Sequence, residues 1–248
     1  MTRLALKAIH PSWEKLFSKA LHTVDPDYLE NLSKENHWLP GKDKLFNAFS
    51  LPLPNVKRIL LGESPYPRIQ SANGYAFWDA AVKEIWAEPQ GIKLSKSVNR
   101  ATSLRNFMKM LLKANNGKPQ TCVETLSELF QNLLDHGFLL LNASLVLHPE
   151  RKVKIDAKYW QDFIKTILNN LYEHNSDIEL ILFGKIAQQI MPLLKHPYKI
   201  IQAEHPYNLS FIENPVVLDY FRPLKLLSPT FSHTPAAARP SPTQGKRG

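Results

Sequence analysis

The stretch that decides the fold is RILLGESPYPRIQSANGYAFW, residues 58–78. It opens with Ile59-Leu60-Leu61, a branched and apolar run that is typical of a buried β-strand. The run stops at Gly62, and the chain then turns through Pro65 and Pro67, which restrict the backbone of the loop. A rigid loop with a carboxylate, a hydroxyl and aromatic rings after a buried strand is a common ligand site in α/β proteins. A plain surface turn before a hydrophobic strand is the alternative, and this stretch alone leaves both open.

The rest of the chain alternates strands with helices. Residues 56–61, 138–142, 178–183 and 198–203 have the apolar composition of buried strands. Helices are predicted at 11–21, 28–34, 41–53, 120–136, 160–173, 187–194 and 215–222, and residues 97–116 are predicted as a loop followed by a helix that Thr102 or Ser103 caps. This order predicts an α/β fold, a three-layer α/β/α arrangement around a central four-stranded, mainly parallel sheet. We expect one domain over residues 1–227.

Composition narrows the function classes. Lys and Arg (31) outnumber Asp and Glu (22), which gives a net charge of +9 and favours a polyanionic partner, either nucleic acid or an acidic membrane surface. The single cysteine, Cys122, excludes a disulfide framework, a four-cysteine zinc site and a cysteine-bound iron–sulfur cluster. We therefore expect a reducing, cytoplasmic location, and no apolar run is long enough to cross a bilayer. Residues 228–248 are rich in Pro, Ser and Thr and lack acidic residues, which predicts a disordered basic tail.

Polar residues follow all four predicted strands. Because the carboxyl ends of parallel strands lie at one edge of a sheet, residues far apart in sequence are expected to meet there. An asparagine or a His-Pro pair after a single strand is usually an ordinary turn, so the coincidence of four such ends carries the argument. The four groups are Glu63-Ser64-Pro65-Tyr66, Asn142-Ala143-Ser144, Gly184-Lys185 and His205-Pro206-Tyr207-Asn208-Leu209-Ser210.

These motifs resemble those of the uracil-DNA glycosylase superfamily, in particular the branch of bacterial, mitochondrial and poxviral enzymes. The sequence GESPYP (62–67) stands where that branch has GQDPYH, GYAFW (74–78) where it has GLAFS, and HPYNLS (205–210) where it has HPSPLS. LLLN (139–142) is identical, and LFNAF (45–49), SLRN (103–106) and a Gly-x-x-Ala after the third strand also match. The similarity covers about residues 13–225 in the same order. Each fragment is weak alone, and together they are specific for the superfamily fold.

The resemblance implies a base-flipping hydrolase that releases uracil from DNA in base excision repair. It implies catalytic roles for Glu63, Ser64 and His205, and a base pocket of Tyr66, Phe77 and Asn142. It places Ser103, Ser144, Lys185, Leu209 and Ser210 on the DNA, with Leu209 as the apolar wedge in the emptied stack. It also implies uracil-containing single- or double-stranded DNA as the partner, a monomer without membrane contact, and no metal, iron–sulfur cluster or other cofactor.

One departure from the family motif concerns the chemistry. Ser64 stands where the family has an aspartate that positions water and stabilises the cationic sugar. A serine hydroxyl can hold a water molecule but cannot take its proton at neutral pH, and general-base help is worth roughly 10²–10⁴ in rate. The thermophile-type branch carries a glutamate at the position of Glu63, although those enzymes usually hold an iron–sulfur cluster. Glu63 is therefore our hypothesis for the substitute carboxylate.

Three functions stay open on the sequence alone. The first, which we favour, is uracil excision by a dissociative route that uses His205 and Glu63. The second is a catalytically impaired relative that binds DNA or a protein, which Ser64 favours and the complete base pocket opposes. The third is a hydrolase of another altered base or of a nucleoside, against which Tyr66 and Leu209 argue.

Overall fold

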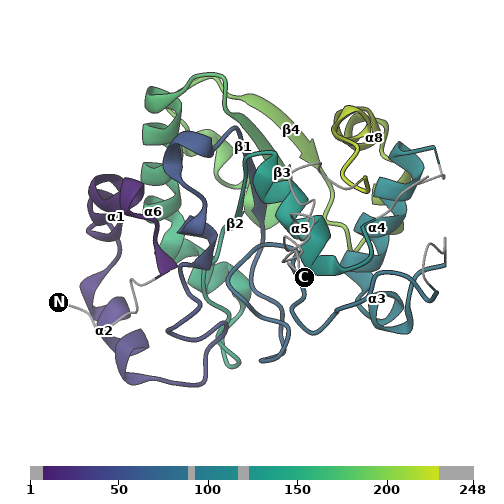
Figure 1. Cartoon of the computed structure of the whole chain (residues 1–248). Helices are drawn as coiled ribbons and strands as arrows, with labels where there is room; N and C mark the ends of the chain where they lie inside the picture. Colours follow the sequence, from purple (N-terminus) through teal and green to yellow (C-terminus); the bar gives the residue numbers. More distant parts are fainter. Residues whose placement is uncertain (1–7, 89–92, 117–122, 229–248) are drawn as a thin grey trace, which may run out of the picture.

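A computed structural model describes residues 8–88, 93–116 and 123–228 (Figure 1). Its centre is one sheet of four strands: β1 (Arg58–Gly62), β2 (Phe138–Asn142), β3 (Glu179–Phe183) and β4 (Lys199–Ala203). The strand order is β2-β1-β3-β4, and every pair is parallel. The α/β fold predicted from the sequence is confirmed, with a sheet that is fully parallel.

Eight α-helices are assigned within the described residues, and they cover both faces of the sheet. They are α1 (Glu14–Leu21), α2 (Pro26–Lys34), α3 (Lys96–Arg100), α4 (Thr102–Ala114), α5 (Leu126–Asp135), α6 (Val153–His174), α7 (Lys185–Gln188) and α8 (Pro215–Phe221). Figure 1 shows α1 and α6 on one side of the sheet and α4 and α8 on the other. Successive β1 side chains alternate between two cores: Ile59 and Leu61 join α1 and α6, whereas Leu60 joins α4, α5 and α8. The three layers follow from this alternation.

Several helix predictions were wrong in detail. Residues 41–53 form mainly turns and a short 3₁₀ helix (Asn47–Ser50) in place of an α-helix, and Asn47 Nδ2 donates to the Asn73 carbonyl at 2.8 Å, which anchors the segment. The helix predicted at 187–194 is divided into α7 and a 3₁₀ turn at Met191–Leu193, which contains Pro192. Neither Thr102 nor Ser103 caps α4: the N-cap is Ala101, and no side chain bonds the helix start.

The remaining predictions on organisation are partly outside the structure. Residues 229–248, where the disordered tail was expected, and Cys122 lie outside the described ranges. The single-domain boundary at 227 stays a prediction. Among the described helices, none combines the length and apolarity that crossing a membrane requires.

Candidate active site

The loops that follow β1 and β2 are bonded to each other at the carboxyl edge of the sheet. The Ala143 N–H donates to the Gly62 carbonyl and the Ser144 N–H to the Glu63 carbonyl, both at 2.9 Å. The parallel hydrogen-bond pattern thus continues past the ends of the two strands. As a result, the first predicted motif and the asparagine of the second are held side by side by the backbone.

Gly62 lies against the two predicted base-binding groups. A Cβ atom at this position would approach Asn142 Oδ1 to 2.8 Å and Phe77 Cε2 to 3.1 Å, so a larger residue would displace one of them. Asn142 is 3% exposed, and its amide makes no hydrogen bond to any residue that the structure describes. The amide atoms are not among the fully buried side-chain atoms that lack a partner, so they still reach solvent. Its donor and acceptor are therefore available to a ligand in this position.

The Phe77 ring is held in place by neighbours on several sides. It packs parallel to Phe107, with ring centroids 6.2 Å apart, and its backbone has a φ of 63°, which is uncommon for an aromatic residue and marks local strain. Tyr66 donates its hydroxyl proton to the Phe77 carbonyl at 3.1 Å, which brings the two rings of the predicted pocket together. Burial raises the pKa of Tyr66 far above its usual 10, and the Asp79 carboxylate adds to this rise, so the phenol stays neutral.

His205 completes this cluster from the loop after β4. Its ring centroid lies 5.8 Å from that of Phe77, and its Nδ1 accepts the Tyr207 N–H at 3.1 Å. Burial lowers the pKa of His205, and the negative charge of Glu63 opposes that shift. Since Nδ1 is an acceptor, the neutral ring carries its proton on Nε2. The imidazole can therefore donate a hydrogen bond without being charged.

The two predicted residues at the start of the β1 loop differ in their surroundings. Glu63 Oε1 accepts the Ile186 N–H at 3.4 Å and lies so close to Gly184 that a Cβ atom there would approach it to 2.3 Å. Its carboxylate therefore faces the β3–α7 turn while remaining electrostatically coupled to His205. Ser64 is half-buried, and among the described residues its hydroxyl makes only a long 3.4 Å bond to the Pro65 carbonyl.

Four of the five predicted DNA contacts lie at least partly on the surface. Lys185 and Ser210 are exposed, Leu209 is 69% exposed, and Ser103 is half-buried in the first turn of α4. Ser144 differs, because it is completely buried and donates its hydroxyl to the Val146 carbonyl at 2.6 Å. This geometry favours a structural role for the Ser144 side chain in place of the predicted phosphate contact.

Two buried side chains that support the cluster were missed. Asn106, which is fully buried in α4, donates Nδ2 to the carbonyls of Pro206 at 2.8 Å and Tyr207 at 3.3 Å. It thereby anchors the loop that carries His205. Its place in the SLRN motif was the available signal. Asp79 is also fully buried, and it accepts a hydrogen bond from Arg68 at 3.0 Å, which closes the loop around Tyr66. No sequence signal pointed to this pair.

Comparison with known proteins gives one consistent result, although no protein-family model matches. The chain is 35% identical over 195 residues to a uracil-DNA glycosylase of Helicobacter acinonychis, covering 75% of this chain and 76% of that protein. It is 28% identical over 188 residues to a uracil-DNA glycosylase of Chlamydia abortus.

Among solved structures, the UNG of Nitratifractor salsuginis superposes with a TM-score of 0.80 at 35% identity, covering 90% of this chain and 94% of that one. A mimivirus uracil-DNA glycosylase shares the fold at a TM-score of 0.58 and 19% identity, covering 80% of this chain and 70% of that one. The Helicobacter relative exceeds 30% identity over three quarters of both proteins, and the motifs that carry the resemblance lie together at one edge of the sheet. The chain therefore belongs to the uracil-DNA glycosylase family.

Proposed function

We propose that the protein excises uracil from DNA by flipping the nucleotide out of the helix and hydrolysing its N-glycosidic bond, as the first step of base excision repair. The observation that carries this proposal is the side-chain amide of Asn142, which pairs with no described residue and lies nearly buried beside the ring of Phe77. An amide donor and acceptor next to an aromatic ring is the chemistry that reads a flipped pyrimidine. Family membership supports the same conclusion.

Selection of the base depends on three side chains. Phe77 stacks on the pyrimidine, and the Asn142 amide pairs with its polar edge, where a cytosine presents the wrong donor pattern. Tyr66, tied to the Phe77 carbonyl, occupies the space beside C5 and excludes the methyl group of thymine. Its raised pKa keeps that wall uncharged.

Bond cleavage separates an anionic base from a cationic sugar. The Nε2–H of neutral His205 donates to the uracil oxygen on which negative charge develops, and the fixed acceptor at Nδ1 holds the ring in that tautomer. Glu63 supplies the negative charge that stabilises the sugar, from the position that also opposes the lowered pKa of His205. Ser64 holds the attacking water by its hydroxyl.

The DNA lies across the same edge of the sheet. Lys185 and Ser103 contact phosphates, Ser210 positions the backbone next to them, and the exposed Leu209 fills the gap that the flipped base leaves. A monomer acting in the cytoplasm is part of the proposal, since a single cysteine suits a reducing compartment.

Ser64 favours a second candidate function, a catalytically impaired glycosylase relative that binds DNA or a protein through this surface. Loss of the family aspartate removes a group whose contribution as a general base is roughly 10²–10⁴ in rate. In this alternative the base pocket binds a flipped uracil and releases none.

The experiment is to measure free uracil by mass spectrometry after incubation with oligonucleotides that carry one uracil, thymine or cytosine at the same position. We expect release from the uracil substrate only, and release of some thymine by Tyr66→Ala, because the wall beside C5 is gone. Binding of all three oligonucleotides without release of any base would refute excision and favour the impaired relative.

A further inference from the structure

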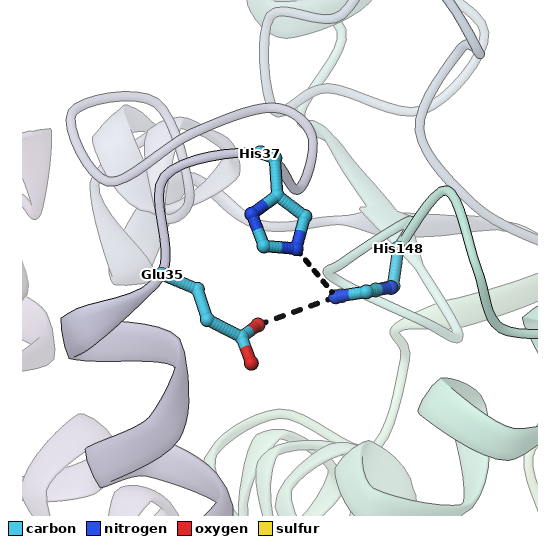
Figure 2. A group of neighbouring side chains, drawn as sticks. All are labelled: Glu35, His37 and His148. Carbon is cyan, nitrogen blue, oxygen red and sulfur yellow. Dashed lines mark hydrogen bonds and ion pairs between the residues drawn. The ribbon is translucent and has the colours of Figure 1, made fainter.

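Three metal-ligating side chains, none of them among the predicted glycosylase site residues, meet between the end of α2 and the loop after β2 (Figure 2). Glu35 is the C-cap of α2, His37 follows two residues later, and His148 belongs to the loop after β2. The two segments are fixed to each other by reciprocal N–H···O bonds of 2.9 Å between Leu39 and Leu147. We propose that Glu35, His37 and His148 bind a divalent transition-metal ion of the zinc type.

The ligand atoms are spaced as such an ion requires. The Nε2 atoms of His37 and His148 are 3.1 Å apart, and His148 Nε2 is 3.3 Å from Glu35 Oε2. A tetrahedral zinc ion with bonds of about 2.0–2.1 Å separates its ligand atoms by roughly 3.3 Å. The three ligand atoms all lie within 4.8 Å of one another. A modest side-chain rotation would therefore bring the remaining pair, Glu35 and His37, to a similar separation.

Burial and charge also fit a cation. Glu35 Oε2 is buried and makes no hydrogen bond within the described part of the chain, and its charged neighbour is His148 Nε2 at 3.3 Å, while Oε1 is oriented by Arg151 at 3.8 Å. Arg151 is in turn 3.6 Å from the buried carboxylate of Asp156, so its charge is shared between two acids. His148 is 3% exposed, whereas His37 is exposed and leaves an entry path and a fourth position for water.

The hydrogen bonds around His148 describe the metal-free form. The Glu150 N–H donates to His148 Nδ1 at 3.2 Å, so the neutral ring carries its proton on Nε2 and directs it at His37 Nε2. An ion at Nε2 moves this proton to Nδ1, because a metal-bound imidazole donates from its other nitrogen. The Glu150 N–H then has to turn away. Metal binding is therefore coupled to a tautomer change that can be observed directly.

Two imidazoles with one carboxylate select zinc and its neighbours over magnesium or calcium, which prefer oxygen ligands. The ion would fasten the end of α2 to the β2 loop, and the inference does not depend on the proposed excision. It departs from the expectation, drawn from the resemblance, that the chain holds no metal. No sequence pattern pointed to this cluster, since His148 lies more than a hundred residues beyond its partners.

The test is calorimetric titration of the tag-free full chain with zinc chloride, in a Cys122→Ser background that removes the only thiol. We expect one saturable site at low-micromolar zinc, a rise in Tm on loading, and no binding of magnesium. His37→Gln and His148→Gln should weaken binding at least about tenfold, the smallest loss typical even of outer-shell partners. His37 is exposed, so that variant tests the site without risk to folding.

The matched control is His196→Gln, because His196 pairs with Glu173 at 3.5 Å and the chain offers no third ligand there within the described residues. It should leave zinc binding unchanged. Imidazole ¹⁵N spectra of the wild type should show His148 changing from the Nε2–H to the Nδ1–H form on loading. No saturable binding, or binding that is the same in His37→Gln and His148→Gln as in the control, would overturn the proposal.

Discussion

Substituting Asn106 should lower both the stability of the fold and the rate of uracil release. Asn106 is fully buried, and its amide donates to the backbone carbonyls of Pro206 and Tyr207 at 2.8 and 3.3 Å. Asn106→Ala removes these two hydrogen bonds, one buried and one partly buried, each worth about 1 kcal/mol net. It also leaves carbonyl groups unpaired, so we expect a loss of about 2–3 kcal/mol in the free energy of unfolding. For a chain of this size that is a drop in Tm of about 5–10 °C.

The same substitution should also impair excision. The loop that Asn106 anchors carries His205 and Leu209, and misplacing a catalytic group by about 1 Å costs on the order of 10² in rate. Single-turnover uracil release measured well below the Tm of the variant should therefore fall about a hundredfold. Circular dichroism at the assay temperature verifies that the variant is folded.

Asn132 provides the matched control. It is another buried asparagine, and its Nδ2 donates to the carbonyls of Leu226 and Ser228 at 3.1 and 2.9 Å, away from the candidate site. Asn132→Ala should lose a similar 2 kcal/mol and keep wild-type release. If Asn106→Ala retained full activity, or if both variants lost activity equally, the claim that Asn106 positions the His205 loop would be refuted.

Three further predictions concern the same edge of the sheet. Because burial lowers the pKa of His205, the wild type should lose stability relative to His205→Gln as pH falls below the ordinary value of 6.5, and a constant difference in unfolding free energy would contradict this. Lys185→Glu should weaken oligonucleotide binding and flatten its dependence on salt by about one charge, so an unchanged slope would remove Lys185 from the interface. Leu209→Ala should change stability by less than about 0.5 kcal/mol, since the side chain is 69% exposed. It should slow release from duplex DNA more than from single strands, and equal slowing on both would argue against a wedge.

The sheet could be predicted from the sequence because its strands are short, nearly continuous apolar runs. Residues 138–142 are buried at every position, so a continuous apolar run was enough to find β2. The start of α6 was harder to predict. The helix begins at Val153, before the predicted Trp160. Its first two turns contain Lys154 and Lys158, which interrupt the apolar pattern used to find helices. Buried Asp156 also broke the apolar pattern there, since its burial depends on Tyr28, which donates to it from 128 residues away.

For the candidate site, the location of the residues could be predicted, but the direction of their side chains could not. The topology rule brought Glu63, Asn142 and His205 to one edge without any contact being known, because the carboxyl ends of parallel strands share that edge. The direction of individual side chains could not be predicted. Ser144 turns inward to the Val146 carbonyl, and the Glu63 carboxylate turns to the β3–α7 turn, because hydrogen bonds formed only in the folded chain decide both orientations.

The central claim is that this family member excises uracil with serine at position 64 and its carboxylate at Glu63. The measurement that tests it most directly is the single-turnover rate of uracil release from one single-stranded oligonucleotide by the wild type, Glu63→Gln, Ser64→Asp and His205→Ala. We predict release by the wild type, and a loss of roughly 10²–10⁴ in Glu63→Gln, with a comparable loss in His205→Ala. A silent wild type that becomes active only as Ser64→Asp would contradict the account and show a base pocket whose chemistry has been lost.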